Sequence, residues 1–228
     1  MHHLLFIICT CFLFTACKED AKKGADCYDN YNNTQLINYQ GTERAFVLYL
    51  PDGYDGSRKV PLLFNFHGFG GSTNDHLNTS DMRQLADRDT FILVYPQGSC
   101  LEGFSHWNAA LPSATNKSTV DDLGFIDFLI NDLSSNYEVD SARIYACGYS
   151  NGAFFSYALA CYLGHKIAAI GSVSGTMLDS SLQCSPSHPT AMINLHGTND
   201  GVVPYNGSSE YIAIPDVVDY WCQQNNTD

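Results

Sequence analysis

The pentapeptide Gly148-Tyr149-Ser150-Asn151-Gly152 decides the fold of this chain. The apolar run at 144–147 is short enough to be a buried strand, and apolar residues recur at helical spacing from 153 to 161. A strand that turns into a helix within so few residues forces the residue between them into a strained backbone conformation, and the flanking glycines remove side chains that would collide. The pattern therefore predicts Ser150 at a sharp strand-to-helix turn, with its hydroxyl lifted clear of a sheet.

The position of Ser150 makes it a candidate nucleophile. Backbone N–H groups at a helix N-terminus favour developing negative charge, as the oxyanion of an acyl-transfer intermediate requires. A G-x-S-x-G pattern also arises by chance in a chain with 18 glycines. The predicted strand before it and helix after it favour the catalytic interpretation.

Length and charge limit the number of domains and the classes of binding partner that we expect. The 228 residues suffice for one large α/β domain, and the 45% hydrophobic content suffices for a sizeable core. Eleven Lys and Arg against 24 Asp and Glu give a net charge of -13. This balance argues against nucleic-acid binding, which needs cationic groups to neutralise phosphates.

The N-terminal segment has the pattern of an export signal. Residues 1–16 contain no Asp, Glu, Lys or Arg, and their apolar stretch is too short to span a membrane. The segment 13–17, Leu-Phe-Thr-Ala-Cys, resembles a bacterial lipobox, whose cysteine becomes the lipidated first residue. We expect a signal peptide at 1–16, a lipid anchor at Cys17, a polar tether over 17–34, and an outer-membrane or cell-surface lipoprotein. Ordinary cleavage near Ala16, giving a periplasmic or secreted protein, is the alternative.

The cysteines beyond residue 17 suit an exported protein with disulfides. The six allow 15 connectivities. The position of Cys147 at the end of a buried strand favours a free thiol, whereas Cys161 and Cys184 lie in neighbouring elements and are predicted to pair. No two of the six show a C-x-x-C spacing, which weakens any zinc interpretation. The six are Cys27, Cys100, Cys147, Cys161, Cys184 and Cys222.

Hydrophobic patterning predicts strands alternating with helices. The segment 97–117 is expected to be a long irregular loop, in which Trp107 either lines a cleft or anchors packing. A helix around 81–87 is expected to bury Met82, Leu85 and Ala86. Strands are predicted at 44–50, 60–66, 91–95, 144–147, 167–173 and 191–195. Further helices are predicted to start within 118–122, to follow residue 152, and to span 212–224.

Two loops and one acidic pair next to these elements are candidates for a functional site. A glycine-rich loop at 67–72 follows a buried strand and either turns backbone N–H groups towards a ligand or forms a plain tight turn. Asp200 lies just beyond another strand, where ligands gather in open α/β sheets, although Asn-Asp-Gly is also turn chemistry. Asp121 and Asp122 form a possible metal or acid pair, but helix capping explains them more simply.

With these loops in view, the chain resembles α/β-hydrolases, and more closely the secreted esterase family of feruloyl esterases, acetylxylan esterases and polyhydroxyalkanoate depolymerases. The resemblance implies an α/β-hydrolase fold, with a mostly parallel sheet flanked by helices, over 35–228. It implies no cofactor and no metal. The matching segments are 67–72, 120–125, 142–152 and 196–205.

Carried over by position, the resemblance makes Ser150 the nucleophile and Asp200 the triad acid, with the N–H groups of Phe69 and Asn151 as the oxyanion hole. In this fold the triad histidine follows the acid along the chain. No histidine follows Asp200 here. We therefore expect the sequence to be truncated at its C-terminus, without the final strand, helix and histidine loop.

The leading functional hypothesis is a serine carboxylester hydrolase acting through an acyl-enzyme on small or polysaccharide-linked feruloyl or acetyl esters. An aromatic cleft would be compatible with a feruloyl group but does not distinguish feruloyl from acetyl esters. The residues that could form it are Phe69, Trp107, Tyr149 and Tyr205. A polyhydroxyalkanoate depolymerase is one alternative. A surface lipoprotein with an intact turn but no base, acting in binding or as a remnant, is another. A peptidase of the same fold is less favoured, and the oligomeric state is left open.

Overall fold

The computed structural model describes residue 27 and residues 34–112, 118–178 and 184–227. The predicted signal peptide, the lipidation site at Cys17 and nearly all of the tether lie outside these residues, so they stay predictions. Within the described residues, no helix is both long and apolar enough to cross a membrane.

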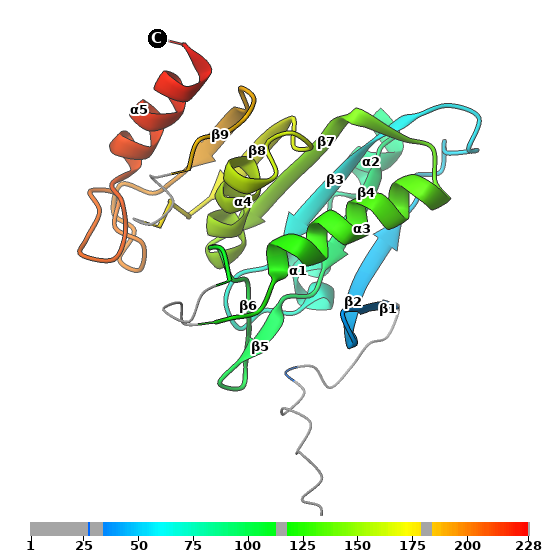
Figure 1. The fold of residues 1–228 in the computed structure, drawn as a ribbon, viewed down its shortest axis with the longest axis horizontal. Coiled ribbons are helices and arrows are strands. Elements are labelled where there is room, and N and C mark those ends of the chain that lie inside the picture. The colour runs from blue at the N-terminus through cyan, green and yellow to red at the C-terminus, as the bar shows by residue number, and fades with distance from the viewer. Residues whose placement is uncertain (1–26, 28–33, 113–117, 179–183, 228) are drawn as a thin grey trace, which may run out of the picture.

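A seven-stranded mixed sheet forms the centre of the fold, in the order β1-β2-β4-β3-β7-β8-β9 (Figure 1). The strands from β4 through β3, β7 and β8 to β9 pair in parallel, whereas β2 pairs antiparallel with β1 and β4. The predicted mostly parallel sheet is confirmed. The strands are β1 Gln35–Tyr39, β2 Thr42–Tyr49, β3 Val60–Phe66, β4 Ile92–Pro96, β7 Val139–Tyr149, β8 Ala169–Val173 and β9 Ala191–Leu195.

Helices cover both faces of this sheet. Alternate residues of a strand point to opposite faces, so Leu62 and Phe64 of β3 join a large hydrophobic cluster on one face while Leu63 packs against a smaller cluster on the other. The large cluster contains residues of α3, α4 and α5, and the small one lies against α1 and α2. The helices are α1 Thr73–Thr79, α2 Arg83–Asp89, α3 Asp122–Asn136, α4 Asn151–Tyr162 and α5 Ile214–Asn225.

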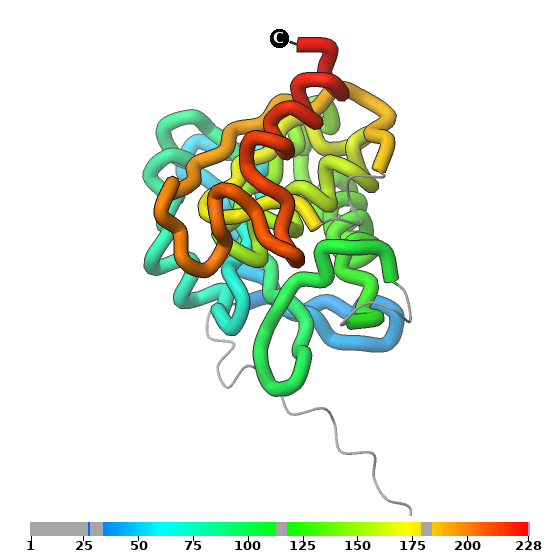
Figure 2. Tube along the Cα trace, turned by 90° about the vertical axis from the view of Figure 1, so that its left-hand side faces the viewer, coloured from blue at the N-terminus to red at the C-terminus, as the bar shows by residue number. Residues whose placement is uncertain are grey.

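Helix α4 is the most deeply buried helix of the described part of the fold. Every residue from 152 to 161 is buried, including the five apolar residues that the sequence predicts on one face. The sheet covers one side of α4, and α3 and α5 contribute to the same cluster, with Tyr157 of α4 stacked on Trp221 of α5. In Figure 1 α5 lies beside β9 at one edge of the sheet, and Figure 2, which views the molecule from that side, shows α5 (red) in front of the rest of the chain.

Two predicted elements need correction. The segment 97–117 is not wholly irregular, because β5 Ser99–Leu101 and β6 Phe104–His106 form an antiparallel hairpin within it. Three-residue strands are too short to show a periodic pattern. The helix expected at 81–87 is α2, which begins at Arg83; Ala86 faces the sheet and is fully buried, so Leu85 beside it points outward and is 38% exposed.

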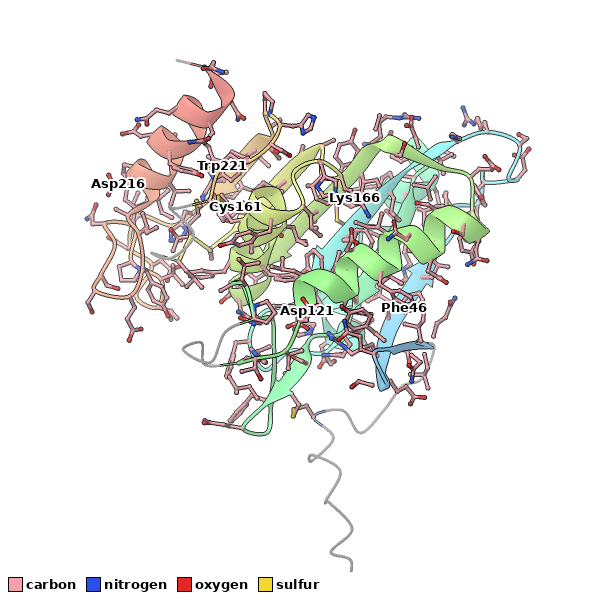
Figure 3. The ribbon with its side chains drawn as sticks, viewed as in Figure 1. Phe46, Asp121, Cys161, Lys166, Asp216 and Trp221 are labelled. Atoms are coloured by element: carbon pink, nitrogen blue, oxygen red, sulfur yellow. A yellow bond between two sulfur atoms is a disulfide. The ribbon has the colours of Figure 1, made fainter. Side chains whose placement is uncertain are left out.

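The predicted disulfide between Cys161 and Cys184 is present and joins the end of α4 to the segment before β9 (Figure 3). A second disulfide, Cys27–Cys100, ties residue 27 to the β5–β6 hairpin. Cys147 is free, as predicted, and burial raises the pKa of its thiol to about 12. Cys222 is also free.

One buried ion pair holds β2, α3 and the hairpin together. The guanidinium of Arg44 donates to Asp122 at 2.8 Å and to the carbonyl of Gln97 at 3.1 Å, and it lies 4.0 Å from the Phe125 ring centroid. Asp122 also accepts from the backbone N–H of Asn108 at 2.8 Å. A buried charge with this many partners becomes costly when one partner is removed.

We therefore predict that Arg44→Ala lowers the free energy of unfolding by about 3–5 kcal/mol, because Asp122 is left charged and unpaired in the interior. Denaturant unfolding followed by circular dichroism measures the loss. The matched control is Arg88→Ala, which removes an ion pair whose side chains are 68% and 52% exposed and should leave stability unchanged. Equal stability of the two variants would show that the Arg44 pair does not organise the fold.

Candidate active site

Ser150 occupies the sharp turn that the sequence predicts, between the last residue of β7 and the first of α4. Its backbone has φ 51° and ψ −121°, a strained conformation for a residue with a side chain. A Cβ atom on Gly148 would collide with the backbone of Gly152, and one on Gly152 would collide with the carbonyl oxygen of Phe66. Both glycines are therefore required by close backbone approach.

The glycine-rich loop after β3 lies directly against this turn. A Cβ atom on Gly68 would lie 3.4 Å from the Cβ of Ser150 and 3.1 Å from the ring of Tyr149, so only glycine fits comfortably. Within the described part of the chain, the backbone N–H groups of Phe69 and Asn151 donate no hydrogen bond. The structure thus brings the loop beside Ser150 and leaves both candidate oxyanion donors available.

His67 braces this loop from the protein interior. Its side chain is buried, its Nδ1 donates to the carbonyl of Gly68 at 2.7 Å, and its Nε2 accepts from the N–H of Gly98 at 2.9 Å. Burial lowers the pKa of His67 to about 4, so the ring is neutral near pH 7 and can accept this bond. Both ring nitrogens are therefore engaged in fixing the loop.

The β5–β6 hairpin braces the same loop from outside. The N–H of Gly70 donates to the carbonyl of Ser105 at 2.7 Å, and the Ser105 hydroxyl donates to the carbonyl of Gly71. The hairpin itself is tied to residue 27 by the Cys27–Cys100 disulfide. None of these contacts has a sequence signature, because each joins residues brought together only by the tertiary fold.

Trp107 is a packing anchor rather than a lining of an open cleft. It is 1% exposed, stacks on Phe155 with ring centroids 4.9 Å apart, and meets Phe66 edge-on. The side chain of Asn151 accepts from the N–H of Trp107 at 2.7 Å and donates to its carbonyl at 3.0 Å. The residue after Ser150 therefore holds the Trp107 segment through its side chain while its own N–H stays available.

Asp200 lies in the loop after β9, at the same edge of the parallel sheet as Ser150, with β8 between their strands. One carboxylate oxygen accepts from the N–H groups of Val203 and Val202, both at 2.9 Å, and these bonds lower the pKa of Asp200. The other oxygen is 3.7 Å from Nε2 of His196, which lies 2.8 Å from the carbonyl of Val203. No contact between Asp200 and Ser150 is present among the described residues.

No histidine in the described ranges forms a hydrogen bond with the side chain of Ser150. His67, His76 and His106 are buried, and burial lowers the pKa of each. The hydroxyl of Ser150 forms no hydrogen bond with any described residue. The candidate nucleophile and the two candidate oxyanion donors thus lie together here, and no described histidine is hydrogen-bonded to the Ser150 hydroxyl.

Asp121 and Asp122 have structural partners. The carboxylate of Asp121 caps α3 by accepting from the N–H of Gly124 at 2.9 Å, and it also accepts from the Tyr39 hydroxyl at 2.8 Å. Asp122 forms the buried pair with Arg44. The capping interpretation is confirmed for Asp121, and the described ranges hold no group of three or more His, Cys, Asp or Glu placed to bind a metal.

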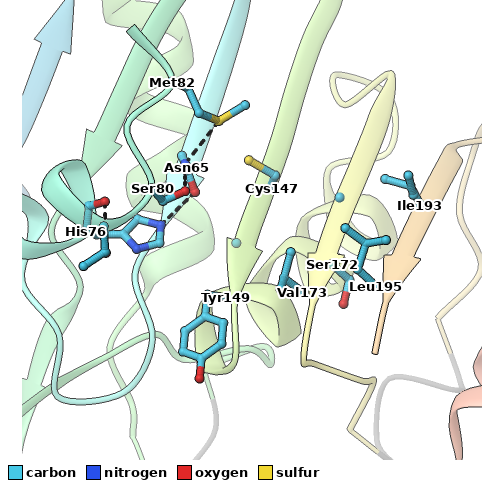
Figure 4. A pocket seen from close by; sticks show the side chains of 13 residues that line it. Asn65, His76, Ser80, Met82, Cys147, Tyr149, Ser172, Val173, Ile193 and Leu195 are labelled. Atoms are coloured by element: carbon cyan, nitrogen blue, oxygen red, sulfur yellow. Dashed lines mark hydrogen bonds between the residues drawn. The ribbon is translucent and has the colours of Figure 1, made fainter. Parts of the chain in front are cut away.

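A cavity of about 680 Å³ lies on the face of the sheet that carries α1 and α2 (Figure 4). Tyr149 lines it at the end of β7. On its wall, the side-chain oxygen of Asn65 accepts from Nε2 of His76 at 2.8 Å and the side-chain nitrogen of Asn65 donates to the Ser80 hydroxyl at 3.2 Å. Ser150 is not among its lining residues. Its apolar floor comes from β7, β8 and β9 through Cys147, Val173, Ile193 and Leu195.

The fold and this strand-to-helix turn place the chain among the α/β-hydrolases. Similar solved structures include a thermostable esterase, with a TM-score of 0.63 and 19% identity over 86% of this chain and 53% of that one. A Bacillus cereus carboxylesterase matches with a TM-score of 0.58 and 20% identity over 79% of this chain and 81% of that one. At these identities the likeness concerns the fold.

Sequence similarity identifies the family to which the chain belongs. Residues 44–202 match the family model described as esterase PHB depolymerase, and the chain belongs to that family. Curated relatives include feruloyl esterase B of Piromyces equi, 30% identical over 80% of this chain and 34% of the relative. A probable feruloyl esterase C of Aspergillus clavatus is 32% identical over 80% of this chain and 64% of the relative. The chain therefore spans less than two thirds of the length of these relatives.

The close approach at Gly152 can be tested by one methyl group. In Gly152→Ala the new Cβ meets the backbone carbonyl of Phe66, which cannot move without displacing β3, so we expect a loss of about 3 kcal/mol of stability. The control is Gly201→Ala, where a Cβ meets nothing within 4 Å. Thermal unfolding should separate the two variants clearly; matching melting temperatures would contradict this description of the turn.

Proposed function

We propose that this protein hydrolyses carboxylic esters through an acyl-enzyme formed on Ser150. The observation that carries the proposal is the strained Ser150 beside two backbone N–H groups, of Phe69 and Asn151, that have no partner among the described residues. Preorganised donors of this kind stabilise the charge that develops on the carbonyl oxygen during acyl transfer. Membership of the esterase family supports the same chemistry.

In the proposed reaction the Ser150 hydroxyl oxygen attacks the ester carbonyl carbon and its proton passes to a base. The carbonyl oxygen becomes an oxyanion held by the N–H groups of Phe69 and Asn151. The intermediate collapses, the alcohol leaves with the proton from the base, and water then releases the acid by the same steps. The role of Asp200 is to orient and stabilise an imidazole, using the carboxylate oxygen that Val202 and Val203 do not occupy.

The base must be an imidazole that reaches both Ser150 and Asp200. Because no described histidine is hydrogen-bonded to the Ser150 hydroxyl, we propose that this imidazole comes from outside the described residues. Without a base the serine hydroxyl is scarcely ionised near neutral pH, and the attack loses most of its driving force. Serine hydrolases that lack one triad member keep about 10³ to 10⁴-fold acceleration over water, supplied by the oxyanion hole and binding.

The substrate class that we propose is a feruloyl or acetyl ester. The support is the names of the curated relatives, which are feruloyl esterases and a bifunctional acetylxylan esterase/xylanase. We also propose that the protein is exported and anchored by a lipid at Cys17. The disulfides Cys27–Cys100 and Cys161–Cys184 support export, since such bonds persist in oxidising compartments.

The test is whether an added base raises the activity of Ser150. We predict that the polypeptide of residues 1–228 hydrolyses p-nitrophenyl acetate only at a trace rate, and that added imidazole raises this rate in a saturable manner by serving as the base. The Ser150→Ala variant, measured at each imidazole concentration, gives the background reaction of imidazole with the ester. Ser57→Ala, in an exposed loop where the Ser57 hydroxyl donates to Asp55, is the matched control and should be rescued fully.

Two outcomes would overturn the proposal. Rescue that survives Ser150→Ala would place the nucleophile elsewhere. Unassisted turnover at ordinary esterase rates, about 1–10³ s⁻¹, that Ser150→Ala abolishes would show that a histidine within residues 1–228 is the base, and His196→Ala would then be the first variant to measure.

A further inference from the structure

Two phenylalanines stack against each other on the outside of the molecule. Phe69 is 56% exposed and Phe104 is 55% exposed, yet their ring centroids are 5.5 Å apart with an interplanar angle of 29°. Leaving two aromatic rings this exposed forgoes the free energy that burial would supply. Such a pair offers a surface on which another aromatic ring can stack.

The surface is held rigidly from both sides. Phe69 belongs to the loop that His67 fixes from the interior, and Phe104 is on β6 of the hairpin. Loop and hairpin are joined one residue from each ring, by the hydrogen bond from the Gly70 N–H to the Ser105 carbonyl. A ligand that stacks here meets rings whose backbones are already ordered, which reduces the entropy lost on binding.

The surface adjoins Ser150 through the backbone of the loop. Gly68 lies against Ser150, and the next residue supplies both the proposed oxyanion donor, the N–H of Phe69, and the first ring of the pair. A Cβ atom on Gly70 would lie 3.8 Å from the Phe104 ring, so the second ring covers the following residue. A substituent on a carbonyl carbon bound at Ser150 can therefore reach the rings across a short spacer.

We propose that the Phe69–Phe104 pair binds the aromatic ring of the substrate's acyl group, and so selects arylalkenoyl esters of the hydroxycinnamoyl kind over acetyl esters. The inference rests on the proposed function of Ser150 and narrows its substrate class. An acetyl group ends at its methyl and has no ring that could stack on the pair. An aromatic ring separated from the carbonyl by two carbons reaches the pair and stacks on it in an offset or edge-on arrangement.

Binding rather than turnover tests this proposal, in the Ser150→Ala background, where no ester is consumed. The dissociation constant of methyl ferulate is measured by NMR titration for Ser150→Ala and for the double variant that adds Phe104→Ala. Loss of one stacking ring should weaken binding about three- to tenfold. Adding Phe104→Tyr should retain the affinity. Adding Leu36→Ala, which removes an apolar side chain of similar exposure, 49%, on β1, should leave it unchanged.

Three results would overturn the proposal: no effect of Phe104→Ala on methyl ferulate; an equal effect on phenyl acetate, whose ring is on the alcohol; or an effect on xylobiose binding in place of methyl ferulate. Thermal unfolding of each variant shows whether a change in affinity comes from lost structure, and Phe104→Tyr keeps the test valid if Phe104→Ala unfolds. Because no arm depends on turnover, failure of the rescue experiment and failure of this one are separate results.

Discussion

The contact between Gly152 and the carbonyl oxygen of Phe66 is the constraint on which the rest of the structure depends. Helix α4 can begin immediately after β7 only if its first turn rests on the end of β3, and this requires a residue without a Cβ. At this turn Ser150 adopts a strained backbone conformation with positive φ. The strain is supported by a helix in which every residue from 152 to 161 is buried.

A second constraint is the fixed position of the loop after β3. Two backbone N–H groups stabilise an oxyanion effectively only when they do not reorganise during the reaction. Of the two proposed donors, the N–H of Asn151 belongs to the start of α4, and the N–H of Phe69 lies in a loop held by buried His67 and by the hairpin residue Ser105. The buried pair of Arg44 and Asp122 positions the hairpin in turn, through Gln97 and Asn108. The same network of hydrogen bonds and one ion pair therefore supports both the stability of the fold and the geometry of the site.

The sequence predicted the parts of the fold that have a local signature. The bounds of β3 and β9 were predicted to the residue, and the Cys161–Cys184 disulfide followed from neighbouring elements. The β5–β6 hairpin and the Cys27–Cys100 disulfide were missed. Their strands are too short for periodicity, and the bond spans 73 residues that only the tertiary fold brings together. The stacking of Phe104 on Phe69 was invisible for the same reason.

The central claim is that the strained turn makes Ser150 the nucleophile. It is tested most directly by locating a covalent adduct after reaction with diethyl p-nitrophenyl phosphate, using imidazole as the base and mass spectrometry of the digested protein. If Ser150 is the nucleophile, one diethylphosphoryl group forms on the peptide that contains Ser150, and Ser150→Ala carries no adduct. A phosphoryl group on another residue, or equal labelling of the wild-type and variant chains, would contradict it.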